Sequence, residues 1–160
     1  MRNDISVGLG EIKISKEPED VLVAFGLGSC VGVSMYDPLV KVGGLLHAVL
    51  PISNGKDTPT PKYADSGIEL LIDQLMKTGA NRTRLLVKMA GGANMLTAPG
   101  LSQTFDIGTR NIDAARTVLK KFGLKIINEE VGGQIGRTVR LYVANGRVTI
   151  RTMGGQERDF

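Results

Sequence analysis

The spacing of the apolar residues is the feature that most restricts the fold of this chain. In the first fifty residues they alternate with polar residues or form short runs, which is the pattern of β-strands. Two later segments place apolar residues three and four positions apart, as on one face of an amphipathic helix. Strands before, between and after two helices predict an α+β fold.

Four segments before residue 51 have the pattern of strands. They are residues 5–14, with a bulge expected near Gly10, then 21–25, 31–36 and 41–50. The dipeptide Asp37-Pro38, a strong turn signal, separates the last two. We therefore expect segments 31–36 and 41–50 to pair as an antiparallel hairpin.

Two amphipathic segments predict helices. The first has Ser66 and Glu69 at the spacing of a capping box, and Gly79 at the position of a C-terminal cap. The second has Asn111 as its expected N-cap and Gly123 as its stop. Their apolar stripes are Ile68, Leu71, Ile72, Leu75 and Met76 in the first helix, and Ile112, Ala115, Leu119 and Phe122 in the second.

The remaining strands are expected at residues 85–89, 124–127, 138–144 and 148–152, with Asn145-Gly146 predicting a type I′ turn between the last two. Segment 51–61, rich in Pro and polar residues, predicts a mobile loop. The fold class is therefore α+β, with mixed, largely antiparallel sheets covered by two main helices. The length of 160 residues predicts one domain spanning residues 1–160.

Composition excludes several function classes. One Cys and one His cannot form an intrachain disulfide or a four-ligand zinc site, so we expect no metal and no cofactor. The net charge is +4, but no Lys/Arg run interleaved with aromatic residues favours nucleic acid. No signal peptide is visible, and the longest uncharged stretch, residues 21–36, is too short for a membrane helix. We expect a soluble, cytoplasmic protein without membrane insertion.

Cys30 follows Gly28 and Ser29 on a glycine-bracketed bend at the start of a predicted strand. The surrounding residues match neither the dinucleotide fingerprint, which needs a third glycine, nor a complete nucleophile elbow, which needs a following helix. Glycines at such a bend let backbone N–H groups of Gly28 and Ser29 face a ligand, as an oxyanion hole requires. The alternative is a buried structural cysteine that acts as a small hydrophobe.

Hairpin register relates Cys30 to His47. If the two strands pair around residues 37–40, these two side chains lie directly opposite each other, with Cβ atoms about 5 Å apart. A slip of one residue would place them on opposite faces. Such a pair supports nucleophilic catalysis, in which the thiol proton moves to the imidazole and the thiolate attacks an acyl carbon. The alternative for His47 is a satisfied histidine in an apolar strand.

Two glycine clusters, residues 90–94 and 131–137, lie at predicted strand ends. Both could wall a substrate cleft, for which Gly91, Gly92 and Asn94 are the candidate residues, and Asn94 or Gln134 could hold an amide. The alternative is a pair of turns with tightly packed backbone. Lys62-Tyr63 and Arg110-Asn111 flank the predicted helix starts. We expect them to be solvated, and the alternative is contact with a substrate.

With these residues in view, the sequence resembles the chemoreceptor glutamine deamidase family, CheD. This resemblance implies an α/β sandwich, distantly similar to deamidating bacterial toxins. It also implies hydrolysis of glutamine side chains in the cytoplasmic helical region of methyl-accepting chemotaxis receptors, to glutamate and ammonia, with Cys30 and His47 as the catalytic residues. The motifs that carry it are GLGSCVGV at 26–33, HAVLP at 47–51, KYADSGIELL at 62–71, KMAGGANM at 88–95, IGTRN at 107–111 and GGQIGR at 132–137.

The chain departs from the family pattern at one position. The third catalytic residue of the family is a Thr six positions before the Cys, where this chain has Ala24. Another group must then orient His47: a backbone carbonyl, a water or a hydroxyl such as that of Ser29. Ala24 also motivates a rival hypothesis, a deamidase-like binding module that regulates a CheC-type phosphatase of the response regulator, which the family is reported to bind. A basic nucleic-acid binder is a third hypothesis, and it rests only on the isoelectric point.

Overall fold

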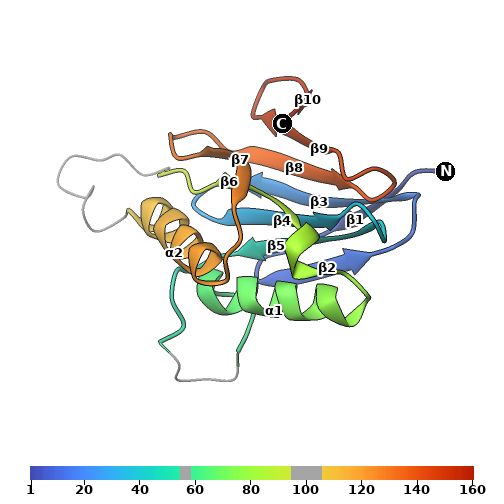
Figure 1. The fold of residues 1–160 in the computed structure, drawn as a ribbon. Helices are drawn as coiled ribbons and strands as arrows, with labels where there is room; N and C mark the ends of the chain where they lie inside the picture. Colours follow the sequence, from blue (N-terminus) through green and yellow to red (C-terminus); the bar gives the residue numbers. More distant parts are fainter. Residues whose placement is uncertain (55–58, 95–105) are drawn as a thin grey trace.

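The computed structural model describes residues 1–54, 59–94 and 106–160 and shows two mixed sheets packed face to face, with both main helices on the outer side of the second sheet (Figure 1). The first sheet contains, in order, β1 (Asn3–Ser6), β3 (Asp20–Leu27), β8 (Arg137–Tyr142), β9 (Val148–Thr152) and β10 (Arg158–Asp159). The second contains β2 (Glu11–Ser15), β5 (Val42–Ala48), β4 (Val31–Asp37), β6 (Leu86–Gly91) and β7 (Ile126–Val131).

The helices are α1 (Ala64–Lys77) and α2 (Ile107–Lys121), and a short 3₁₀ turn, η1 (Arg82–Arg84), precedes β6. Most strand pairs are antiparallel, whereas β1 with β3 and β6 with β7 are parallel. The predicted α+β class, with largely antiparallel sheets and two covering helices, is confirmed. None of the helices among the described residues is long and apolar enough to cross a membrane.

The second sheet is buried on both faces, and the side chains of β5 alternate between two apolar clusters. Leu46 packs with both helices, whereas Leu45 packs against the first sheet. His47 has the same parity as Leu45, so its side chain faces the first sheet. Because β5 is sandwiched in this way, His47 lies in the interior between the two sheets.

The first predicted strand is two strands in different sheets. The prediction of one strand with a bulge near Gly10 is wrong, because the chain leaves the first sheet after β1 and enters the second at β2. Gly10 takes a φ of +69° at this crossing, a conformation that glycine adopts without strain. Apolar alternation continues on both sides of the crossing, so the pattern alone could not separate the two strands.

Both helix starts differ from the prediction, and both helix ends agree with it. Helix α1 begins one residue after Tyr63, while the Ser66 hydroxyl donates to the carbonyl of Thr60, so the expected capping box is absent. Helix α2 begins after Asp106, which places Asn111 inside the helix and not at its N-cap. The glycines that follow the two helices, Gly79 and Gly123, have φ of +99° and +71°, as C-terminal caps require.

The β4–β5 hairpin has a different register from the one predicted. Its loop spans residues 38–41, with Lys41 at φ +54°, and Gly32 is the residue opposite His47. The prediction that Cys30 lies directly opposite His47 is therefore wrong by two residues. Asp37 stays in the strand opposite Val42, and its carboxylate accepts hydrogen bonds from Asn81 and Arg84, which lie outside the hairpin.

The last strands agree with the prediction except in detail. Strand β9 has the predicted bounds, whereas β7 extends to Val131 and β10 was not predicted. The Asn145-Gly146 turn does join β8 to β9, but of the two residues only Gly146 has a positive φ, so the turn is not type I′. The mobile loop predicted at 51–61 lies in part outside the described residues.

Candidate active site

Cys30 lies in a bend between β3 and β4, partly exposed and packed against the apolar cluster between the sheets. Three successive carbonyls of this bend are bonded to other elements. The oxygen of Gly28 accepts from the N–H of Ala93, and that of Cys30 accepts from the N–H of Gly92, both at 2.8 Å. The oxygen of Ser29 accepts from the Asn111 amide at 2.8 Å. The bend is therefore fixed from its carbonyl side.

The N–H groups of the same three residues have no hydrogen-bond partner outside their own residue in the part of the chain that the structure describes. Unpaired backbone N–H groups beside a nucleophile are what an oxyanion hole consists of. The predicted support by Gly28 and Ser29 is consistent with this arrangement. Burial raises the pKa of the Cys30 thiol, and the N–H of Cys30 itself offsets part of that effect.

The two glycine clusters of the sequence meet beside this bend. Gly91 has a φ of +102°, and a Cβ there would lie 2.3 Å from the Cys30 carbonyl oxygen, so no side chain fits. Gly132 N–H donates to the carbonyl of Gly91, and the Asn94 N–H donates to that of Gly133. Gly91 and Gly92 thus contact the Cys30 bend directly, whereas the Asn94 side chain bonds to Thr109 on α2.

His47 is almost fully buried on β5, and one ring nitrogen is committed to a backbone group. Its Nδ1 lies 2.9 Å from the carbonyl oxygen of Val7. A carbonyl only accepts hydrogen bonds, so Nδ1 must carry a proton, and in the neutral ring Nε2 then presents a lone pair. Nε2 is buried and has no hydrogen-bond partner among the described residues. Burial lowers the pKa of His47, while the bond to Val7 and the charge of Glu11 act in the opposite direction.

Val7 explains how His47 is held in a chain that has Ala24 at the family's threonine position. The N–H of Val7 donates to the carbonyl of Val23 at 2.8 Å, which attaches this segment to β3 next to Ala24. Ala24 itself is fully buried in the apolar cluster between the sheets. Of the groups considered for orienting His47, the structure has a backbone carbonyl.

Cys30 and His47 lie on the same face of the second sheet but not opposite each other. Gly32 is opposite His47, and Cys30 precedes Gly32 by two residues, so the two side chains are diagonal neighbours. A register shift of two residues keeps every side chain on its face, which is why this part of the expectation survives. No hydrogen bond joins the thiol to Nε2. The two pKa shifts favour a neutral thiol and a neutral imidazole.

Asn111 is a site residue whose role the sequence reasoning missed. It is completely buried, and its Nδ2 donates to the carbonyls of Ser29 and Val49, at 2.8 and 2.9 Å. One amide group thus ties the residue before Cys30 to the segment just after His47. A signal was present, because Asn111 continues the buried stripe of α2 one turn before Ala115. A polar residue in an apolar stripe indicates a specific buried partner.

The other residues singled out from the sequence lie apart from the bend. Gln134 is exposed. The Lys62 ammonium lies 5.9 Å from the centre of the Tyr63 ring, and Arg110 pairs with Asp106 at 3.0 Å. The pairing of Arg110 is local, because Asp106, the residue just before α2, lies one helical turn away from it.

Comparison with known proteins decides the family. Residues 49–152 match the family model described as CheD, chemotactic sensory transduction. The chain belongs to the CheD family. It is 45% identical over 158 residues to "Probable chemoreceptor glutamine deamidase CheD" of Symbiobacterium thermophilum, covering 97% of this chain and 96% of that one. It is 42% identical over 152 residues to "Chemoreceptor glutamine deamidase CheD" of Thermotoga maritima, covering 95% and 94% of the two chains.

A solved structure supports the fold of this CheD-family chain. The Bacillus licheniformis hypothetical protein YfiH superposes with a TM-score of 0.50 at 14% identity, over 74% of this chain and 49% of that one. At this identity the similarity concerns the fold alone. The family-model match begins at Val49, after both Cys30 and His47, whereas the two relatives align with nearly the whole chain.

Proposed function

We propose that this chain, as one domain spanning residues 1–160, hydrolyses glutamine side chains in the cytoplasmic helical region of chemoreceptors, releasing ammonia and leaving glutamate. The observation that carries the proposal is the bond from His47 Nδ1 to the Val7 carbonyl, which leaves an unpaired Nε2 on the sheet face that Cys30 shares. The relatives named chemoreceptor glutamine deamidase support the substrate. The place of action would be the cytoplasm.

The first half of the reaction forms a thioester. Nε2 of His47 takes the thiol proton as Cys30 Sγ bonds to the amide carbon. The oxygen of the tetrahedral intermediate accepts hydrogen bonds from N–H groups of the 28–30 bend. The imidazolium then donates its proton to the amine, the C–N bond breaks and ammonia leaves.

The second half releases the product. With its Nε2 lone pair restored, His47 deprotonates a water molecule that attacks the thioester carbon. The C–S bond breaks, the thiolate takes the proton back from the imidazolium, and glutamate leaves. Each proton is returned, so the sequence needs no cofactor.

The resting geometry fits a mechanism in which the base acts only when substrate is bound. Diagonal neighbours on adjacent strands have Cβ atoms within about 7–8 Å, so rotation about χ1 of Cys30 can bring Sγ to Nε2. Desolvation keeps both groups neutral before substrate arrives. The neutral imidazole is the form that can accept a proton.

The test is deamidation of a receptor cytoplasmic fragment followed by mass spectrometry. We expect a gain of about 1 Da per converted glutamine with the natural chain and none with Cys30→Ala, which lacks the nucleophile. The matched control is Thr83→Ala, an equally small change at an exposed position on η1, and it should retain activity. Equal gain with Cys30→Ala would exclude the thioester mechanism. No gain with the natural chain, together with retained binding of a CheC-type phosphatase, would favour the regulatory module.

A further inference from the structure

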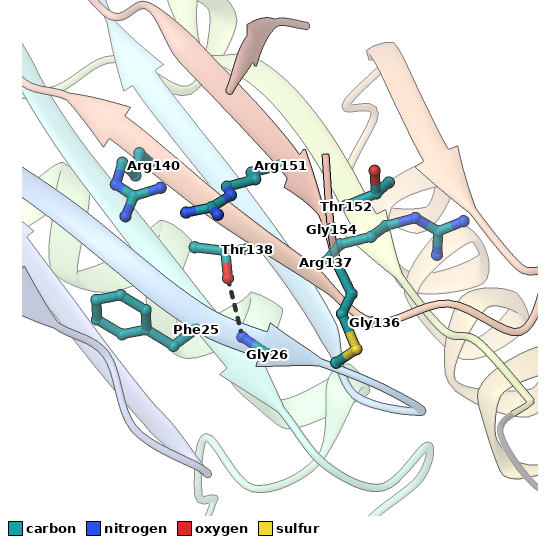
Figure 2. A pocket seen from close by; sticks show the side chains of 10 residues that line it. Phe25, Gly26, Gly136, Arg137, Thr138, Arg140, Arg151, Thr152 and Gly154 are labelled. Atoms are coloured by element: carbon teal, nitrogen blue, oxygen red, sulfur yellow. Dashed lines mark hydrogen bonds between the residues drawn. The ribbon is translucent and has the colours of Figure 1, made fainter. Parts of the chain in front are cut away.

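A cavity of about 270 Å³ opens on the first sheet, apart from the groups assigned to the reaction. Figure 2 shows Phe25, Thr138, Arg140 and Arg151 gathered on one side of this sheet, while the Arg137 guanidinium points away from them. The cavity is lined by Phe25, Gly26, Gly136, Arg137, Thr138, Arg140, Arg151, Thr152, Met153 and Gly154. The cavity therefore has two guanidinium groups, those of Arg140 and Arg151, and its lining contains no carboxylate residue.

The arginines of this cavity are only partly neutralised. Arg140 reaches Glu157 at 3.6 Å, and its buried Nε has no hydrogen-bond partner among the described residues. Arg151 donates to the carbonyl of Gly155 and has no ion-pair partner in the described ranges. Arg137, which is 9% exposed, points away from the cavity side chains (Figure 2) and pairs with Glu130 at 3.4 Å, so it supplies no free donor to the cavity. Donors thus exceed the acceptors that face them, which favours an anionic occupant.

Two large apolar side chains flank the arginines. Phe25 is 52% exposed and Met153 is 76% exposed, although both are residue types that gain by burial. The Arg140 guanidinium lies 5.7 Å from the centre of the Phe25 ring, which holds the ring beside the charge. Guanidinium groups next to exposed apolar side chains match an amphipathic segment that carries carboxylates.

The cavity lies close to the candidate nucleophile. Gly26 in its lining precedes Cys30 by four residues, and an extended chain of that length spans at most about 14 Å. Arg137 also donates to the carbonyl of Gly91 at 3.3 Å, and Gly91 contacts the Cys30 bend. A segment bound at Cys30 therefore has this cavity within reach.

We propose that the cavity is a docking site for carboxylate side chains on the receptor helix that carries the target glutamine. This inference rests on the proposed deamidation of receptor helices. With a helical rise of 1.5 Å per residue, about 14 Å corresponds to roughly nine residues. Glutamates up to about nine positions from the target would bind Arg140 and Arg151, and the apolar side of the helix would cover Phe25. Because deamidation makes a carboxylate, each converted site within that span becomes a further ligand for the cavity.

Binding to an inactive enzyme tests this docking site without turnover. The probe is a fluorescent helical receptor peptide with one glutamine and two glutamates six to nine positions away, and anisotropy reports its binding to the Cys30→Ala chain. The double change Arg140→Gln with Arg151→Gln should weaken binding about tenfold. Arg82→Gln, which removes one positive charge on η1 and matches the charge change of either single variant, should leave binding unchanged. Replacing both peptide glutamates by glutamine should weaken peptide binding by a similar factor. With that peptide, the arginine changes should have no further effect on binding.

Two further measurements keep the test decisive. Arg151→Gln alone changes an exposed side chain, so its smaller loss remains measurable if the Arg140 change impairs folding. The loss should shrink between about 50 and 500 mM salt, because exposed charges are screened. Arginine variants that bind like Arg82→Gln, or displacement of the peptide by equimolar duplex DNA, would overturn the proposal. Arginine-dependent binding without any deamidation by the natural chain would refute the proposed function and leave the docking site standing.

Discussion

The two ends of the β4–β5 hairpin differ in how their polar groups are satisfied. At the turn, Asp37 is fully buried and its carboxylate accepts hydrogen bonds from Leu39, Asn81 and Arg84. At the other end, three bend N–H groups and Nε2 of His47 are without partners among the described residues. Buried polar groups are normally paired, so the buried, unpaired Nε2 beside the partly exposed N–H groups of the bend indicates a place where another molecule completes the bonding.

We expect this difference to separate stability from chemistry within one hairpin. The turn end fixes the register, because Asp37 bonds to residues outside the hairpin and cannot slip along the ladder. The Cys30 end inherits that register and leaves donors and an acceptor free. Changes at the turn should therefore lower the free energy of unfolding, and changes at the Cys30 end should lower the rate of deamidation.

The largest expected effect is that of His47→Gln on deamidation. Loss of the acid–base group should reduce kcat/KM by about 10⁴-fold, the upper range for such a group. The free energy of unfolding at pH 7.5 should change little, because the glutamine remains a buried polar residue close to the Val7 carbonyl. Single-turnover kinetics and urea unfolding measure the two quantities. Retained activity in His47→Gln would show that another group acts as the base.

Asp37→Ala should produce the opposite result. Removing one partner of a buried ion pair leaves Arg84 and the N–H of Asn81 unmatched, which costs about 3–5 kcal/mol of unfolding free energy. Urea unfolding measures this cost. The control is Asp73→Ala, which removes one partner of an exposed ion pair on α1. The fraction that stays folded should still deamidate. A fully stable Asp37→Ala chain would contradict the role assigned to the turn.

How far the sequence could predict this hairpin depends on which interactions set each feature. Local signals predicted β4, β5 and the Asp37-Pro38 turn, because alternation and turn chemistry act over a few residues. The register depended on Asn81 and Arg84, which lie far away in sequence, so local turn preference placed Cys30 two residues from its true pairing. The prediction still put Cys30 and His47 on one face, since an even shift preserves parity.

Asn111 and Val7 show the same limit at the candidate site. Asn111 looked like an N-cap because a single sequence shows the residue type and not its partners, Ser29 and Val49. The carbonyl that holds His47 belongs to the backbone of Val7, and backbone groups leave no mark in a sequence. A candidate nucleophile and a candidate base could be chosen from residue type, and their roles stay a prediction, whereas the groups that orient the His47 ring required the fold.

Asn111→Leu should have an intermediate effect, and it should lower both the rate of deamidation and the free energy of unfolding. The change removes two hydrogen bonds that hold the Cys30 bend against the segment after His47, and small displacements at a reacting centre cost about 10²-fold in rate. The loss should appear in kcat more than in KM, with a drop of about 1–3 kcal/mol in unfolding free energy. Asn128→Leu on β7, an amide outside the bend, is the matched control. An effect on KM alone would argue against a positioning role.

Acid should weaken the two ends in separate pH ranges. Burial alone would raise the pKa of Asp37, but the bonds from Arg84, Asn81 and Leu39 outweigh it and lower the pKa from 3.8 to about 2. The unfolded chain therefore binds this proton first, so about 2 kcal/mol of stability is present above pH 4 and is lost as the pH falls through 2. His47, whose pKa is lowered from 6.5, loses its contribution as the pH falls below 6.5. In unfolding curves measured across this pH range, His47→Gln should lack the loss of stability below pH 6.5. Asp37→Asn should lack the loss that occurs as the pH falls towards 2.

Ala24→Thr should have the smallest effect, and it tests whether the Val7 carbonyl suffices to orient His47. Nδ1 has one proton to donate, and that proton is already bonded at 2.9 Å, so a nearby hydroxyl adds no required bond. We expect kcat/KM to change by less than about threefold, the size of a redundant hydrogen bond. Ala24→Ser, which adds a hydroxyl without the methyl group, controls for crowding in the apolar cluster. A gain of about tenfold or more in both variants would show that the carbonyl holds the imidazole less well than a side-chain hydroxyl.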